Sequence, residues 1–151
     1  DAVVATWARH YLLRTSWLIG EGHNFVRTMA GLAQRGASPA VVDDQHGRLT
    51  FTSELARAIR HLLEGEAPFG TYNVSNGGPT QTWADIAAEV FRLSGRDPGD
   101  VVRVSTADYA EGKDLAPRPV HSTLQLDKIT AAGFRPEEAA PALERYLAAQ
   151  G

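Results

Sequence analysis

Cysteine is absent from the 151 residues, which excludes a disulfide framework, a thiolate zinc site and a cysteine nucleophile. An intracellular, cytoplasmic protein therefore fits the sequence best. No apolar run approaches the roughly 18 residues that a membrane span needs, and no signal peptide opens the chain, so we expect no membrane partner. The net charge of −3 offers no basic surface for nucleic acid, which we also exclude as a partner.

Methionine occurs only once, as Met29, so the chain does not begin at a natural start codon. Glycine and proline are modest in number, while 43% of the residues are hydrophobic and 22% are charged. That composition is typical of a soluble globular domain that can bury a core. We therefore expect residues 1–151 to form a single segment of a longer protein.

Several sequence motifs that are diagnostic of a particular activity are missing. The sequence contains no G-x-G-x-x-G fingerprint, P-loop, H-E-x-x-H helix or G-x-S-x-G elbow. Its five histidines are scattered without the spacing of metal ligands. These absences leave the function to be sought in polar residues at strand ends and in loops.

Local patterns predict helices that alternate with short strands. Strands are expected at residues 11–17, 39–44, 71–76 and 101–106, with residues 11–13 buried in a parallel sheet. Helices are expected to begin near Asn24, Thr52 or Ser53, Thr82, Leu126 and Pro136. The alternation predicts an α/β fold with a largely parallel sheet.

Side-chain patterns give these helices further detail. Asn24 is expected to cap its helix, and Thr82 with Asp85 resembles a capping box. An apolar stripe is expected on the helix after residue 52, formed by Leu55, Ile59, Leu62 and Leu63.

Three polar clusters lie where open α/β sheets bind ligands, at strand ends and in loops. The first is Arg14–Trp17, whose Trp17 either caps the core or offers a flat face to a sugar or base. The second, Asp43–Arg48, is a ligand loop or an ordinary turn. The third is Arg118–Pro119, whose arginine is either solvated or suited to a phosphate.

Four segments carry a resemblance through their order and spacing. They are LLRTSWLIGEGHNFVRTM, VVDDQHGRLTFTSELARAI, GTYNVSNGGPTQTWADIAAEVF and RPVHSTLQLDKI. Together they resemble the carboxyl-terminal half of the dTDP-4-dehydrorhamnose reductases, which are extended short-chain dehydrogenase/reductases. The resemblance extends from about Tyr11 to Tyr146, nearly the whole chain. It implies the carboxyl-terminal part of a Rossmann-type parallel sheet plus a small α/β lobe that binds a nucleotide sugar.

The resemblance also implies an activity. Such enzymes reduce dTDP-4-keto-L-rhamnose to dTDP-L-rhamnose with NADPH or NADH, in dTDP-rhamnose biosynthesis. Their catalytic Tyr-x-x-x-Lys pair and their cofactor-binding glycine-rich loop are expected upstream of residue 1. We therefore assign no catalytic residue within this chain, and we expect the fragment alone to be inactive. The resemblance also allows a homodimer and bound Mg²⁺, for which no ligand residues are assigned.

The resemblance implies roles for particular residues. Trp17 matches the tryptophan that contacts the sugar, and Thr15 and Ser16 match the segment near the nicotinamide end of the cofactor. Asn24 and Phe25 would begin the helix that faces the nucleotide. The other matched positions are Arg118 for the diphosphate, with Pro119 in the same motif, and Gln45, Gly47 and Thr50 in a loop that shapes the pocket. Leu49 departs from the proline expected in that loop.

Other interpretations remain open at this point. One is a non-catalytic module of the same fold, like the regulatory subunit of methionine adenosyltransferase. The preference for arginine over lysine, 13 to 2, favours the biosynthetic enzyme. Another is a different nucleotide-sugar epimerase, dehydratase or reductase, with UDP or GDP in place of dTDP. The last is an α/β domain whose surface loops bind nothing.

Overall fold

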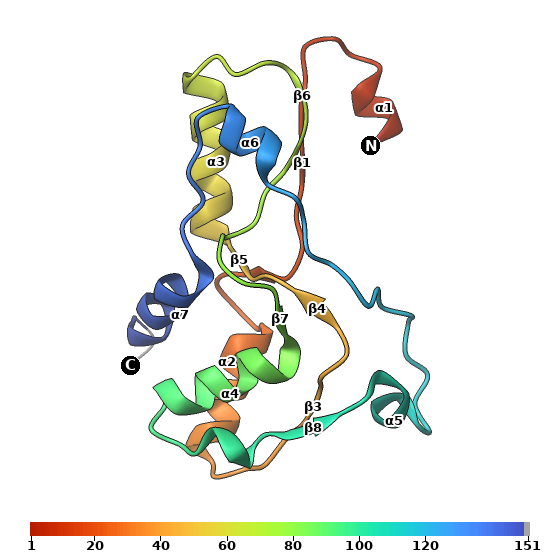
Figure 1. Ribbon diagram of the computed structural model, residues 1–151, viewed down its shortest axis with the longest axis vertical. Helices are drawn as coiled ribbons and strands as arrows, with labels where there is room; N and C mark the ends of the chain where they lie inside the picture. The colour runs from red at the N-terminus through yellow and green to blue at the C-terminus, as the bar shows by residue number, and fades with distance from the viewer. Residues whose placement is uncertain (150–151) are drawn as a thin grey trace. The chain divides into compact units, whose positions relative to one another are not determined.

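The computed structural model describes residues 1–149, and the chain forms two compact units (Figure 1). The first unit contains residues 1–20, 48–78 and 124–142. The second contains residues 21–47 and 79–123 and the residues from 143 onward. Each unit is therefore assembled from separate stretches of the sequence.

The strands of the first unit pair in parallel. β1 (Tyr11–Arg14) pairs with β6 (Gly70–Asn73), and β2 (Leu18–Ile19) pairs with β5 (Thr50–Phe51). The strand expected at residues 11–17 thus stops at Arg14, because Trp17 has a φ of 49°, which an extended strand cannot accommodate. The expectation of a fully buried strand is also wrong, since the first three residues of β1 are only half-buried.

Helices α3 (Thr52–Glu64) and α6 (Asp127–Ala131) complete the first unit, beside a short exposed helix, α1 (Ala2–Ala5). Figure 1 shows α3 and α6 next to the β1–β6 pair. The core between them is apolar and consists of Ala58, Leu62, Ala67, Tyr72, Val74, Ile129 and Phe134. It forms because these elements each bring one apolar face to the same place.

Two expectations for α3 are wrong. Neither Thr52 nor Ser53 caps the helix, which begins at Thr52 after Phe51 without a side-chain cap. The predicted stripe is also displaced: Leu62 is buried, but Ile59 and Leu63 are 41% and 61% exposed. The buried face instead follows Glu54, Ala58 and Leu62, at a spacing of four residues, because the Glu54 carboxylate can be buried where Arg57 and the Glu137 amide donate to it.

In the second unit, α2 (Phe25–Gln34) packs with α4 (Trp83–Leu93). The predicted caps are confirmed. The Asn24 side chain accepts a hydrogen bond from the Arg27 amide, and Thr82 and Asp85 form a reciprocal capping box. These local motifs fix where both helices begin.

The strands of the second unit form two pairs. β3 (Ala40–Val42) is parallel to β8 (Val102–Val104), and β4 (His46–Gly47) is antiparallel to β7 (Gln81–Thr82). A turn of 3₁₀ helix, η1 (Pro98–Asp100), precedes β8. The strand expected at residues 101–106 ends early because Ser105 caps an unexpected helix, α5 (Thr106–Ala110).

The last helix, α7 (Ala139–Ala148), begins later than expected. Pro136 lies before it rather than in its first turn, which contains Pro141 instead. The reason is a backbone interaction: Gly77 donates to the Glu137 carbonyl at 2.7 Å, and Ala139 donates to the Gly77 carbonyl at 3.1 Å. These bonds hold the segment extended and delay the helix.

The α/β class is confirmed by this alternation of helices with strand pairs, three of which are parallel. The described strands form four separate pairs rather than one small sheet. Among the described residues, no helix is both long enough and apolar enough to cross a membrane.

One buried carboxylate joins α3 to the segment that precedes α7. Glu54 is 3% exposed and accepts two hydrogen bonds from Arg57, each of 2.9 Å, and a third from the Glu137 amide at 2.9 Å. Arg57 also lies over the Phe134 ring, 4.7 Å from its centroid. The hydrogen bond to Glu54 raises the pKa of the Arg57 guanidinium, so Arg57 stays charged.

We predict that Glu54→Ala lowers the free energy of unfolding by about 2–3 kcal/mol, because the Glu137 amide and Arg57 lose their acceptor. Glu64→Ala is the matched control, since Glu64 pairs with Arg60 on the exposed face of the same helix. Its effect should stay within about 0.5 kcal/mol. Urea denaturation of both variants measures the difference, and equal losses would contradict this role of Glu54.

Candidate functional site

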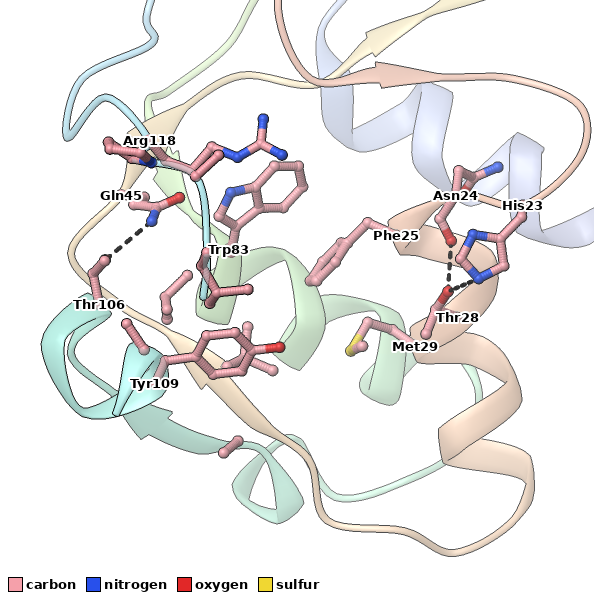
Figure 2. Close-up of a pocket in the computed structure, with 17 residues that line it drawn as sticks. His23, Asn24, Phe25, Thr28, Met29, Gln45, Trp83, Thr106, Tyr109 and Arg118 are labelled. Carbon is pink, nitrogen blue, oxygen red and sulfur yellow. Dashed lines mark hydrogen bonds between the residues drawn. The ribbon is translucent and has the colours of Figure 1, made fainter. Parts of the chain in front are cut away.

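The second unit contains a cavity of about 580 Å³ (Figure 2). Its walls come from the beginnings of α2 and α4, from β3, from α5 and from the irregular segment 115–118. The size is ordinary for a small-molecule site. Mostly apolar walls with a few polar groups are typical of small-molecule sites.

Two aromatic rings form one wall. Phe25 begins α2, Trp83 begins α4, and their ring centroids lie 4.5 Å apart with the planes inclined by 54°. Met29 lies one turn further along α2 and also lines the cavity. Such a surface suits the flat face of a base or the apolar side of a sugar.

Asn24 lies next to Phe25 and anchors the start of α2 to other parts of the protein. Its Oδ1 caps α2, while its Nδ2 donates to the Tyr146 hydroxyl at 2.8 Å and to the Gly22 carbonyl at 3.2 Å. Its side chain is therefore already committed to protein atoms. Asn24 therefore contributes to the cavity by fixing the start of α2, where Phe25 lies.

A hydrogen-bonded chain forms the polar side of the cavity. Asp44 accepts from the Thr106 amide at 2.9 and 3.0 Å and from the Thr106 hydroxyl at 2.5 Å. The same hydroxyl oxygen lies 3.0 Å from Gln45 Nε2. The Thr106 side chain, followed by its amide, holds the pKa of Asp44 below its ordinary value.

An ion-pair network holds the loop that carries Asp44 and Gln45. Arg103 on β8 bonds to Asp43 at 2.7 Å and to Asp85 at 2.9 Å, and Asp43 also accepts from the Thr82 hydroxyl at 2.7 Å. The hydrogen bond to Asp85 is the largest influence that raises the pKa of Arg103. The network ties the loop after β3 to α4 and β8, and so fixes the backbone from which Gln45 projects.

Arg118 brings the positive charge to the cavity. Its side chain lines the cavity, and Figure 2 shows it next to the Trp83 indole. Within the described part of the chain it makes no hydrogen bond or ion pair. An arginine with five free donors beside an apolar ring is well placed to meet an anionic group.

The structure thus brings together four of the predicted site residues: Asn24, Phe25, Gln45 and Arg118 all line this cavity. Gly47 and Pro119 belong to the same unit without lining it, and Gly47 is paired with Gln81 in the β4–β7 ladder. The remaining predicted residues belong to the first unit: Thr15, Ser16, Trp17 and Thr50.

Thr50 has a structural role within that unit. It is fully buried, its hydroxyl donates to the Ser16 carbonyl at 2.7 Å, and its amide donates to the Trp17 carbonyl at 3.0 Å. In this geometry the Thr50 side chain is not placed to contact a ligand directly. Leu49, which replaces the expected proline, is buried, and its carbonyl accepts from the Asn76 amide, so the loop keeps a defined backbone.

Trp83, Met29, Thr106 and Tyr109 also line the cavity, although the sequence alone did not mark them as site residues. Trp83 carried a usable signal, since a large aromatic immediately after a capping box lies at an exposed helix start. Thr106 and Tyr109 carried none, because α5 itself was not predicted. His23 also lines the cavity, 3.4 Å from the Thr28 hydroxyl, while His46 stacks on His121.

Tyr109 and Lys113 have the spacing of a Tyr-x-x-x-Lys pair, although the resemblance places the catalytic pair upstream of residue 1. The helix ends at Ala110 and Gly112 has a φ of 71°, so Lys113 does not lie one helical turn beyond Tyr109. Its Nζ instead lies over the ring, 3.8 Å from the centroid. This is a cation–π contact rather than an ammonium beside a phenol oxygen, so the pair lacks catalytic geometry.

Among the described residues, no group of three or more His, Asp or Glu side chains is placed to hold a metal ion. The chain also lacks the glycine-rich loop of a dinucleotide site. Exposed Thr15 and half-buried Ser16 supply at most one edge of such a site.

A family model described as the RmlD substrate binding domain matches residues 1–151. The chain belongs to this family. A dTDP-4-dehydrorhamnose reductase from Streptomyces griseus is 41% identical over 131 residues, which make up 83% of this chain and 42% of the relative. A dTDP-4-keto-6-deoxy-D-glucose reductase from Streptomyces niveus is 40% identical over 126 residues, with the same two coverages.

Solved structures agree with the family. The crystal structure of a dTDP-4-dehydrorhamnose reductase from Bacillus anthracis, in complex with NADP, matches with a TM-score of 0.80 and 31% identity. The match covers 93% of this chain and 48% of that one. The predicted resemblance and the Rossmann-type α/β class are thereby confirmed. This RmlD domain spans less than half the length of the relatives that it matches.

The hydrogen bonds from Thr106 to Asp44 predict that the stability of the fold depends on pH in the acid range. We expect Thr106→Val to raise the pKa of Asp44 toward its ordinary value, because the strongest lowering contact is lost. Since the folded-state pKa is lowered, the stabilisation is present above about pH 3.9, the unfolded value, and is lost as the pH falls through the folded value. An NMR titration of the Asp44 carboxyl carbon measures this. Thr106→Ser should leave the pKa unchanged, and an unchanged pKa in Thr106→Val would contradict the assignment.

Proposed function

We propose that this chain is the substrate-binding portion of a reductase that converts dTDP-4-keto-L-rhamnose to dTDP-L-rhamnose with NADPH or NADH. The observation that carries the proposal is the cavity, which combines a Phe25–Trp83 wall with the unpaired Arg118 guanidinium. A nucleoside diphosphate has the matching parts, a flat ring and a charged diphosphate. The names of the relatives add the dTDP-linked keto sugar as the class of substrate.

Trp17 is the candidate for the sugar contact. Its φ of 49° is a left-handed conformation that costs a non-glycine residue about 1–2 kcal/mol. The strain is held by the two hydrogen bonds from buried Thr50 to the carbonyls of Ser16 and Trp17. Strain maintained by a buried clamp is common at ligand sites, which supports a functional role for the half-buried indole.

The cofactor and the remaining partners belong to the same proposal. A nicotinamide cofactor would supply the hydride, and the Thr15–Ser16 segment after β1 is our candidate to contact it. The Ser16 carbonyl is fixed by Thr50, so that edge is preorganised. We also propose a cytoplasmic protein, and a homodimer as its assembly.

We predict that Arg118→Ala weakens binding of thymidine diphosphate to the full-length protein by about 1.5–3 kcal/mol, the value of a lost charged hydrogen bond. Binding of thymidine, which has no phosphate, should be unchanged. Arg35→Ala is the control, because Arg35 is exposed at the end of α2 in the same unit. Isothermal titration calorimetry measures all three proteins, and wild-type affinity in Arg118→Ala would remove Arg118 from the site.

We predict that Trp17→Ala in the full-length enzyme lowers turnover of the dTDP-keto sugar while the melting temperature stays within a few degrees. Trp17→Phe should recover part of the activity, because it keeps an aromatic face. Steady-state kinetics and thermal unfolding test the pair. Collapse of the fold in Trp17→Ala would instead assign Trp17 to the core.

Thermal shifts with thymidine, uridine and guanosine diphosphates test the nucleotide class. The proposal expects thymidine diphosphate to raise the melting temperature. A larger shift with the guanosine ligand would favour another nucleotide-sugar enzyme of this fold. No shift with any ligand at millimolar concentration would contradict nucleotide binding altogether.

A further inference from the structure

Gln45 is a buried polar side chain in the wall of the cavity. It is 9% exposed, and its Nε2 donates to the Thr106 hydroxyl oxygen at 3.0 Å. Figure 2 shows its carbonyl oxygen on the side away from Thr106, toward Trp83. Among the described residues, no protein donor occupies that oxygen. The cavity therefore has a hydrogen-bond acceptor in a fixed place next to an aromatic ring.

The direction of the carboxamide follows from the neighbouring carboxylate. An ionised Asp44 can only accept, so the single hydroxyl proton of Thr106 must point to Asp44 across their 2.5 Å contact. The Thr106 oxygen is then left as an acceptor for Gln45. Only the nitrogen of the carboxamide can donate to it, which forces Oε1 to the opposite side. Asp44 and Thr106 thus act as positioning residues for Gln45.

The arrangement persists at neutral pH. The pKa of Asp44 lies below its ordinary value because of the bonds from Thr106, so the carboxylate remains an acceptor throughout the physiological range. Reversing the carboxamide would bring its oxygen against the Thr106 oxygen and break the 3.0 Å bond. The chain from Asp44 through Thr106 therefore gives Gln45 one orientation rather than two.

We propose that Gln45 Oε1 accepts a hydrogen bond from an N–H on the ring edge of the ligand, so that the cavity selects a pyrimidine-2,4-dione base over a cytosine base. The inference rests on the proposed function, because it requires the base of the nucleotide to enter this cavity. Thymine and uracil share the relevant chemistry, an N3–H between two carbonyl groups. Cytosine presents a lone pair at N3, which opposes the carbonyl of Gln45.

The rest of the cavity prevents cytosine from avoiding that conflict. Its exocyclic amine lies one ring position away from N3, so reaching Oε1 requires the ring to slide. A ring that packs against Trp83 while its diphosphate binds Arg118 would have to give up one of these contacts in order to slide. A carboxamide that was free to turn over would accept either base, because it carries a donor and an acceptor side by side. The selectivity is therefore a consequence of the Thr106 bond.

The test compares two ligands that differ only at N3 and C4 of the base: thymidine diphosphate and 5-methyl-2′-deoxycytidine diphosphate. In the full-length protein we expect the thymidine ligand to bind at least tenfold more tightly by calorimetry. Thr106→Val should reduce this ratio to less than threefold, because Gln45 can then reverse. Thr106→Ser, which keeps the hydroxyl, should retain it. Replacing thymidine by 2′-deoxyuridine diphosphate, which keeps N3–H, should preserve the preference over the cytidine ligand.

The outcomes separate this inference from the function on which it rests. If wild-type protein binds both ligands equally, or if Thr106→Val keeps the full ratio, Gln45 does not read the base although nucleotide binding stands. If no nucleoside diphosphate binds the wild type, the proposed function and the inference both fall. The wild-type ratio requires no variant, so the inference remains testable even if Thr106→Val does not fold.

Discussion

The hydroxyl of Thr106 is the contact on which the polar side of the cavity depends. It joins Asp44 and Gln45, at the end of β3, to the first residue of a helix some sixty positions later in the chain. Because the Asp44 carboxylate can only accept, the Thr106 hydroxyl proton must point to it, and this in turn determines the orientation of the Gln45 carboxamide. The Arg103 network holds the same loop from behind. The geometry of the cavity is thus set by polar bonds, while its volume is bounded by apolar walls.

The first unit uses the same principle with different groups. Buried Glu54 organises Arg57 and the Glu137 backbone, and buried Thr50 clamps the strained backbone at Trp17. Buried polar groups are costly unless they are satisfied, so each of these residues fixes its neighbours as well as itself. The first unit of this RmlD domain therefore holds the Trp17 backbone by buried Thr50, and the second holds Gln45 by the half-buried pair Asp44 and Thr106.

The features that the sequence predicted well are local. The Asn24 cap and the Thr82–Asp85 capping box depend on residues three positions apart, and both are confirmed. The family resemblance, which depends on the order of four longer segments, is confirmed as well. Failures occurred where distant residues intervene. Pro136 does not begin α7 because Gly77 pairs with Glu137, and the α3 stripe is displaced because Glu54 takes a buried position.

The site shows the same division between local and distant information. Gln45 and Arg118 were selected by resemblance, and the structure brings both to one cavity. The contact between Phe25 and Trp83, and the bond from Gln45 to Thr106, join segments about sixty residues apart that no local pattern connects. Tyr109 and Lys113 show the opposite error, since a familiar spacing carries no catalytic geometry once the helix ends between them.

The most direct measurement is a crystal structure of the full-length protein with bound thymidine diphosphate. We predict that the base lies against Trp83 with its N3–H directed at Gln45 Oε1, and that the diphosphate lies at the Arg118 guanidinium. A base bound outside this cavity, or a diphosphate held without Arg118, would contradict it.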